Sequence, residues 1–424
     1  MTVEKVTTAK SFADLYADGR ACLPGADLPD FAALRDAAMR RVLELGLPTA
    51  RLEQWRYTPA LAKRLDGLGL TPAEAETGAL PAPLSAPAQR VCLRNGCLAG
   101  PLPEAEGLTL RTLEERLAQD PERLLGELRA DAESDSLFVA LNLALLQDAL
   151  FVEAARERPE PTLEIDQRAD AGLANPRLHL RLRAGARVLL IERLRGGGFA
   201  NRRVAIELEP GASLAHFVEM DEEAEATQLG ETAIRVQRDA TYRGYLLYGG
   251  RGLARQDMEI ALAERGASAV LNGGYLLKGR AHGDLTSHIR HAAPDTASSS
   301  VFKGVLDERA RQVFRGKITV EAGAARADGR MTNKTLLLSD QAEIDSKPEL
   351  MIFHDEVQCA HGATSGMIDE EALFYLRSRG LPPASARRLL LRSFLEETLT
   401  GLADDFERRL AESRLDRRLQ EIAG

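Results

Sequence analysis

The hydrophobic pattern divides the chain into three stretches, and the first has helical spacing. Its clearest apolar series is Phe31, Leu34, Ala38, Val42 and Leu45. Residues at i, i+3, i+4 and i+7 share one face of a helix, so this spacing predicts amphipathic helices. Helical spacing returns from Leu113 to Leu150. We therefore predict a mostly helical N-terminal region over residues 1–158, with a short strand pair near 91–98.

The second stretch alternates apolar and polar residues, which is typical of strands. Within it, a Gly flanked by small or turn residues recurs at Gly185, Gly211 and Gly266, with steps of 26 and 55 residues. A coil of roughly 26 residues per turn would place all three at equivalent positions. This predicts a β-solenoid core over residues 159–366. The alternative is an antiparallel sandwich whose hairpin turns happen to use Gly.

The third stretch, residues 367–424, returns to helical patterns. Acidic residues at 369–371 and basic residues at 377 and 379 complement a helix dipole, and Gly380 is a typical stop. Pro382 and Pro383 begin a further helix. An apolar face then follows through Leu395, Leu399, Leu402, Phe406 and Leu410. We predict a C-terminal helical domain.

Composition and charge remove several classes of function. The net charge of −9 argues against binding to nucleic acid, which requires clustered Lys and Arg. The most apolar window, Leu137–Ala155, is too polar and too short to span a membrane, so we predict a buried helix there. Residues 1–19 lack the apolar core of a secretion signal. We expect a cytoplasmic protein.

The four cysteines are too few and too scattered to form a disulfide framework. Cys92 and Cys97, separated by four residues, do not form a Cys-x-x-Cys redox motif, and we interpret them as structural. Cys359 and His361 are two residues apart, so on an extended chain both side chains point to one face and can present a thiolate and an imidazole to one metal. They supply two ligands where iron or zinc usually takes four. The alternative is a buried thiol beside a hydrogen-bonded His.

Other candidates for chemistry are weaker. His282, His288 and His291, with Asp284 nearby, fit no metal-binding template, and a strand would place His288 and His291 on opposite faces. We interpret them as separate structural histidines. The sequence contains neither a phosphate-binding Gly-x-x-x-x-Gly-Lys-Ser/Thr loop nor a Gly-x-Ser-x-Gly nucleophile motif. We therefore expect that this chain does not hydrolyse ATP.

Several motifs resemble the SufB/SufD family of iron–sulfur cluster assembly scaffolds. In the C-terminal half they are Asn333–Ser339, Ile344–Leu350, Cys359–Thr364 and Phe374–Gly380. Upstream they are Arg51–Thr58, Asp284–His288, Lys303–Leu306 and Phe314–Ile318. The resemblance spans nearly the whole chain, and it implies a right-handed parallel β-helix flanked by helical N- and C-terminal regions.

The resemblance also implies partners and a site. B-type subunits of the family carry extra cysteines and a Glu after the matching His, whereas Gly362 follows His361 here, which favours the D-type branch. Such subunits pair with a B-type (SufB-like) sister through their β-helices and bind an ABC-type (SufC-like) ATPase through C-terminal helices. The residues that match the ATPase contact are Phe374, Tyr375, Arg377 and Arg379. Cys359 and His361 would share iron or a transient iron–sulfur cluster with the sister chain, and this chain alone would hold none stably.

The implied role is a non-catalytic scaffold, and two other hypotheses remain. A β-helical carbohydrate-active enzyme would need paired carboxylates and aromatic platforms, but only 5% of the residues are aromatic and the one Trp lies in the N-terminal part. A homodimeric binding module without cluster chemistry agrees with the incomplete ligand pair. A homodimer of the isolated chain therefore stays open.

Overall fold

The computed structural model of the chain describes residues 12–58, 61–65, 69, 83–84, 88–156, 160–170, 172–402 and 405–423. Residues 1–11, on which the expectation about a secretion signal partly rests, lie outside this set. Among the described residues, no helix is both long and apolar enough to cross a membrane.

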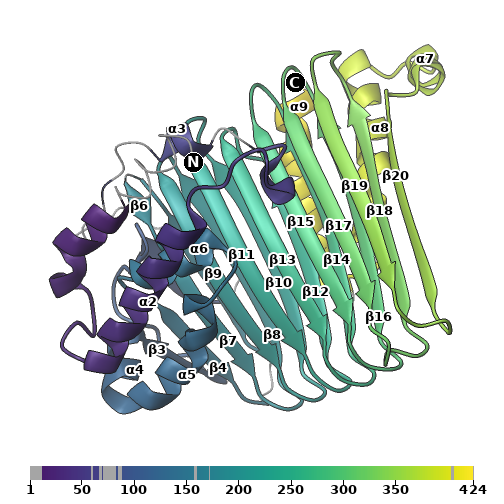
Figure 1. Cartoon of the computed structure of the whole chain (residues 1–424). Coiled ribbons are helices and arrows are strands. Elements are labelled where there is room, and N and C mark those ends of the chain that lie inside the picture. The colour runs from purple at the N-terminus through teal and green to yellow at the C-terminus, as the bar shows by residue number, and fades with distance from the viewer. Residues whose placement is uncertain are drawn as a thin grey trace.

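Two long sheets, stacked face to face, form the body of the molecule (Figure 1). In spatial order, sheet 1 contains β2 (Cys97–Leu98), β1 (Gln89–Arg94), β5 (Thr162–Arg168), β8 (Arg187–Gly196), β10 (Ser213–Glu222), β12 (Thr241–Tyr248), β14 (Ser268–Leu277), β16 (Ala297–Leu306), β18 (Asp328–Leu337) and β20 (Gln358–Gly366). Sheet 2 contains β19 (Glu343–Ile352), β17 (Arg311–Val320), β15 (His282–His291), β13 (Leu253–Leu262), β11 (Thr227–Val236), β9 (Phe199–Leu208), β7 (Arg177–Leu182), β4 (Leu150–Ala154) and β3 (Leu108–Thr112), with β6 (Leu173–Ala174) beside β9.

The chain alternates between the two sheets, so each coil contributes one strand to each. Neighbouring strands are parallel throughout the body, for example β8 with β10 and β16 with β18. Antiparallel pairing occurs at the first end of the stack, between β1 and β2 and between β3 and β4. The parallel β-helix is thus confirmed, and the antiparallel sandwich is wrong. The strand pair expected near 91–98 is present, but it extends sheet 1 through the parallel contact of β1 with β5.

The recurring Gly residues mark one column of turns, as predicted. Gly185, Gly211 and Gly266 all have a left-handed backbone, with φ of 70°, 69° and 74°, and Asp239 occupies the intermediate coil with φ of 54°. Gly suits this conformation because it has no Cβ to clash. The constant step of 26 residues was wrong. The paired residues Arg187 and Ser213 on neighbouring strands are 26 residues apart in the sequence, whereas the paired residues Ala297 and Asp328 are 31 apart. The difference arises because later turns are longer.

Alternation along each strand builds the core between the sheets. Inward-facing residues such as Leu190, Leu214, Phe302 and Phe314 are fully buried there in one continuous cluster. Each fully buried large apolar side chain contributes roughly 1.5–3 kcal/mol relative to exposure. Parallel register places each of these residues over its counterpart in the next coil, so the core of every coil is covered except at the two ends.

N-terminal helices cover the outer face of sheet 2 at the end where β4, β7, β9 and β11 lie (Figure 1). These elements are η1 (Arg20–Cys22), α2 (Pro29–Leu45), η2 (Glu53–Trp55), α3 (Leu61–Arg64), α4 (Leu113–Gln119), α5 (Pro121–Ala132) and α6 (Leu137–Ala144). Their core includes Phe31 and Leu141, packed with Phe199 of β9. The helix predicted over Leu137–Ala155 is correct only up to Ala144. Residues 145–149 form a connection, and Leu150–Ala154 form β4, because pairing with β3 and β7 outweighs local helical spacing.

C-terminal helices cover the outer face of sheet 1 (Figure 1). They are α8 (Pro383–Leu395), η3 (Glu396–Leu399) and α9 (Asp405–Ala423), whereas α7 (Glu370–Ser378) contacts α8 and projects from the molecule. Leu391 and Leu415 pack there against Phe217 and Leu276. The single helical face predicted from Leu395 onward is wrong, since η3 ends that helical segment before α9 begins.

Candidate functional site at the open end of the β-helix

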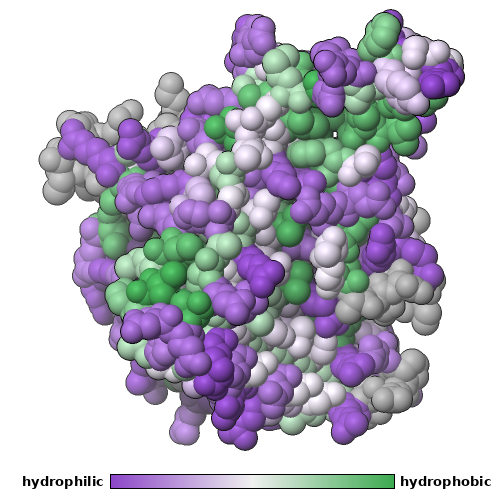
Figure 2. Space-filling view, turned by 90° about the vertical axis from the view of Figure 1, so that its right-hand side faces the viewer, coloured by the Kyte–Doolittle hydropathy of each residue, from purple (hydrophilic) through white to green (hydrophobic). Residues whose placement is uncertain are grey.

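Among the residues that the structure describes, no further strand covers the last coil of the β-helix. Within this set, β19 is paired only with β17, and β20 only with β18. Edge strands expose unpaired backbone groups that can accept a strand from another chain, and proteins normally cover such edges. Here the side chains are exposed as well, including Met351 at 42%, Ile352 at 43% and Phe353 at 59%. We call β19, β20 and the turn between them the open end. Figure 2 looks onto this side of the molecule and shows patches of apolar surface among polar ones.

Cys359 and His361 lie on β20 and point into the last coil. They pair in register with Gly329 and Met331 of β18. Met331 is buried in the core between the sheets, and side chains of paired residues point to the same face of a sheet. The partly buried Cys359 packs against the margin of this core, whereas His361 is exposed. The two side chains therefore share one face, as the spacing predicted.

The protonation of Cys359 follows from its surroundings. Burial raises the pKa of the thiol, and Asp328 raises it further, while a backbone hydrogen bond from Gly329 lowers it. The resting thiol therefore keeps its proton, and a metal would have to displace it. The ring of His361 forms no hydrogen bond with any residue that the structure describes, which leaves both nitrogens available.

This pair is an incomplete ligand set. Among the described residues, no three or more His, Cys, Asp or Glu side chains come together as a group that could hold a metal. The strand opposite, β19, turns Ile344, Ser346 and Leu350 inward, in register with the core-facing side of β17. One hydroxyl among apolar groups does not complete a site for iron, which usually takes four ligands. Any further ligands would have to come from outside the described residues.

Beside the open end, α7 projects from the molecule (Figure 1). None of its residues is buried, and Phe374 and Tyr375 are 71% and 56% exposed. Arg379 lies over the Tyr375 ring at 5.1 Å and, like Arg377, is exposed. Exposed aromatic and Arg side chains are typical of protein interfaces.

The histidine cluster considered from the sequence does not form a metal site. His291 is fully buried between Thr296 and Ser298, at 2.8 Å from each hydroxyl. His288 points to the opposite face and contacts Thr319 at 2.9 Å. His282 and Asp284 instead contact Thr58 of the N-terminal region. All of these histidines are structural, as expected.

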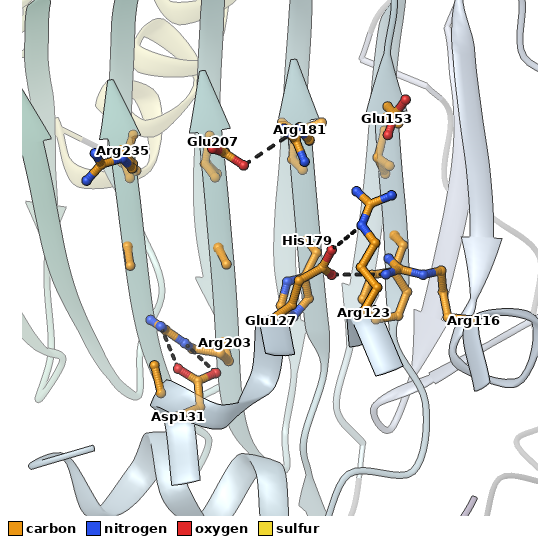
Figure 3. A pocket seen from close by; sticks show the side chains of 18 of the residues that line it. Arg116, Arg123, Glu127, Asp131, Glu153, His179, Arg181, Arg203, Glu207 and Arg235 are labelled. Atoms are coloured by element: carbon orange, nitrogen blue, oxygen red, sulfur yellow. Dashed lines mark hydrogen bonds and ion pairs between the residues drawn. The ribbon is translucent and has the colours of Figure 1, made fainter. Parts of the chain in front are cut away.

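A cavity of about 800 Å³ lies on the outer face of sheet 2 under α5 (Figure 3). Its arginines are mostly paired with carboxylates. Arg203 binds Asp131 at 2.9 Å and Arg116 binds Glu127 at 3.1 Å. His179 stacks on Phe151, and burial together with nearby Arg177 lowers its pKa to about 3. The cavity is therefore lined by largely neutralised charges, which identify no ligand.

A second polar cluster lies inside the β-helix, far from the open end. Glu192 accepts hydrogen bonds from Arg202 and contacts His216 at 2.7 Å, and all three are buried. Burial alone raises the pKa of Glu192, but Arg202 and His216 outweigh it and bring the pKa to about 2. Because each charge has a partner, we assign this cluster to the structure of the core.

Sequence reasoning missed the apolar part of the open end. Ile344, Leu350, Ile352 and Phe353 continue the strand pattern, but their exposure depends on the absence of a further strand over them. The sequence shows that the alternation stops at Gly366, but it does not reveal whether a later segment covers the last inward-facing row.

The chain is thus a parallel β-helix whose last coil carries a thiol and an imidazole on one face, with an exposed helix beside that coil. The chain matches the family described as "SUF system FeS cluster assembly, SufBD core domain" over residues 165–394, which is more than half of its length. It therefore belongs to the SufBD family of iron–sulfur cluster assembly proteins.

Two relatives match over most of their length, and a third matches over a shorter segment. The iron–sulfur cluster assembly protein SufD of Escherichia coli strain K12 is 27% identical over 403 residues, which cover 90% of this chain and 91% of that protein. A SufBD family protein of Synechocystis is 28% identical over 393 residues, which cover 86% of each chain. SufD of Bacillus subtilis is 33% identical over 119 residues, 28% of this chain and 27% of that protein. These similarities support a SufD-type member with a role in SUF-type cluster assembly.

Proposed function

We propose that this chain is the D-type scaffold subunit of a cytoplasmic SUF-type complex and that its open end pairs with a B-type sister subunit. The unpaired edges of β19 and β20 support this proposal, since a second β-helix can add its own strands to them. Exposed Met351, Ile352 and Phe353 would be buried by the same contact. The subunit itself is non-catalytic in this proposal.

Cys359 and His361 then contribute to the assembly of a nascent cluster or to iron acquisition. The observation that carries the proposal is their common inward direction on an edge strand, where a sister chain can supply the missing ligands. Thiolate and imidazole both suit iron. The iron or cluster is cargo that the two chains share for a time, and this chain alone does not retain it.

An ABC-type ATPase docks on α7 and α8 in this proposal, with Phe374, Tyr375, Arg377 and Arg379 as contacts. Exposed aromatic rings and Arg on one projecting helix support this assignment. Replacing Phe374 by Ala would then release the ATPase while the sister chain stays bound, which co-purification measures.

The cluster site is tested by anaerobic reconstitution of the co-expressed complex. Cys359→Ala and His361→Ala should leave the complex assembled and lower the yield of iron and sulfide bound per complex. The matched controls are Cys22→Ala, an exposed thiol far along the chain, and His354→Ala, in the turn before β20. Unchanged cluster yield in both site variants would refute the assignment.

A homodimeric binding module without cluster chemistry is the second candidate, because the same open end can join two copies of this chain. Mass measurement of the natively purified protein separates the two. A sister β-helix and an ATPase in the assembly support the scaffold, whereas a dimer of this chain alone, without iron in any preparation, supports the module.

A further inference from the structure

Three polar side chains on consecutive strands of sheet 1 hold the segment that follows α8. Tyr245 on β12 shares a hydrogen bond of 3.1 Å with the Thr398 hydroxyl. Asn272 on β14 donates to the backbone oxygens of Thr398 and Thr400, at 3.0 and 2.7 Å. Lys303 on β16 completes the row. We call Tyr245, Asn272 and Lys303 the η3 anchor.

Lys303 has the densest contacts of the three. Its ammonium group donates to the backbone oxygen of Phe394 at 2.7 Å, pairs with Glu397 at 2.6 Å and lies 4.6 Å from the centre of the Phe394 ring. The side chain is only 7% exposed. Buried lysines are rarely found without such partners. Its hydrogen bond in turn lowers the pKa of Glu397.

The helix pair α7–α8 is thereby attached at two points. One is the C-terminal end of α8, which the η3 anchor holds on sheet 1 together with the buried side chains of Leu391 and Leu395. The other is the linker of residues 367–369, which joins the end of β20 directly to α7. Three residues span at most about 10 Å, so this linker has little slack. The hydrogen bond from Ala372 to the Asp369 side chain, at 3.0 Å, defines the start of α7.

The two attachments differ in stiffness. The η3 anchor sits on strands that are paired on both sides, whereas β20 is an edge strand paired only with β18. If the end of α8 stays in place, a displacement of α7 must be taken up by β20, which carries Cys359 and His361. If the end of α8 is released, the helix pair can move as a unit and β20 need not follow.

We infer that Lys303 is a positioning residue that fixes the end of α8 on sheet 1, so that movement of a partner bound to α7 is delivered to β20 and its Cys359–His361 pair. This inference rests on the proposed docking of an ATPase at α7. In the proposed function, the Lys303–Leu306 motif neither ligates a cluster nor contacts a partner. The inference gives this motif a role.

Lys334 offers a matched control. It lies beside Lys303 in register on β18 and also reaches Glu397, but at 3.4 Å and with 40% of its side chain exposed. Exposed ion pairs contribute little. Lys303→Met keeps an unbranched side chain of nearly the same length while it removes the charge and its hydrogen bonds.

The experiment is hydrogen exchange on the co-purified complex, with and without a non-hydrolysable ATP analogue, in the wild type, Lys303→Met and Lys334→Met. In the wild type and in Lys334→Met, the analogue should change exchange in peptides from α7 and from β20. In Lys303→Met, the ATPase should still co-purify and α7 should still respond, but the response of β20 should be lost. Cluster yield per ATP hydrolysed should fall in the same variant.

Glu397→Gln provides a second variant, because it weakens the ion pair while Lys303 keeps its bond to the Phe394 backbone. It should reduce the β20 response less than Lys303→Met does. A β20 response in Lys303→Met equal to that of the wild type would overturn the inference, and so would an equal loss in Lys334→Met. Failure of the wild-type chain to co-purify with an ATPase would instead refute the proposed docking.

Discussion

Glu222, buried at the end of β10, offers a sharp test of the electrostatics of this β-helix. Its side chain lies beneath the turn before β13, so closely that a Cβ on Gly250 would come within 2.1 Å of the carboxyl group. Its Oε2 has no hydrogen-bond partner among the described residues. Burial raises the pKa of Glu222 to about 7, and Asp221 raises it too, while the Gly252 N–H and Arg418 lower it.

The sign of the pH effect follows from this shift. The pKa of Glu222 in the folded protein lies above its value in the unfolded chain. The contribution of Glu222 to stability is therefore complete below the unfolded value of 4.5 and is lost as the pH rises to about 7. A Gln at position 222 keeps the shape and does not ionise. Glu222→Gln should therefore raise the free energy of unfolding relative to wild type by on the order of 3 kcal/mol at pH 8 and by well under about 1 kcal/mol at pH 4.

The assay is urea unfolding of both proteins across this pH range, with the difference in the free energy of unfolding plotted against pH. The control is Glu223→Gln, which makes the same change at the neighbouring position, where the side chain is 57% exposed. A pH-independent difference for Glu222→Gln would show that Glu222 ionises normally, and the argument from burial would fail.

Three further predictions concern packing, docking and thiol reactivity. Phe314→Ala should cost about 3–5 kcal/mol in urea unfolding, because Phe314 is fully buried and contacts Phe302 with tilted rings whose centres are 5.5 Å apart. Glu219→Ala should remove hydrogen-exchange protection from α9, since it leaves Arg414 buried without its bidentate partner, a loss of roughly 3–5 kcal/mol; unchanged protection would contradict this. Iodoacetamide at pH 8 should modify exposed Cys22 well before Cys97, because burial and Asp148 raise the pKa of Cys97 to about 11; peptide mass spectrometry compares the two rates.

Local rules explain where sequence reasoning about the fold succeeded. The Gly column at 185, 211 and 266 identified the coil because a left-handed turn has a strong local preference for Gly. The intermediate member of the column, Asp239, could not be predicted. Asp tolerates the same left-handed conformation, but an Asp in a sequence does not by itself indicate such a turn. The number of residues in each coil could not be predicted either, because insertions in exposed turns leave the strand pattern unchanged.

The failures occurred where partners in space outweighed local preference. Residues 150–154 have a helical context but become β4, because two neighbouring strands offer a ladder of hydrogen bonds. The C-terminal helix is interrupted at η3 because Asn272, more than a hundred residues earlier, binds the Thr398 and Thr400 carbonyls. The local sequence of these segments indicates neither contact.

The sequence by itself determined the alternation that builds the parallel β-helix, the helical ends, and the shared face of Cys359 and His361, since each follows from the period of an extended or helical chain. Only the tertiary structure decided that this face lies on an uncovered edge, that the other histidines are satisfied internally, and that Lys303 meets Glu397. Exposure and long-range pairing depend on which segments cover one another in three dimensions, and no local pattern specifies that.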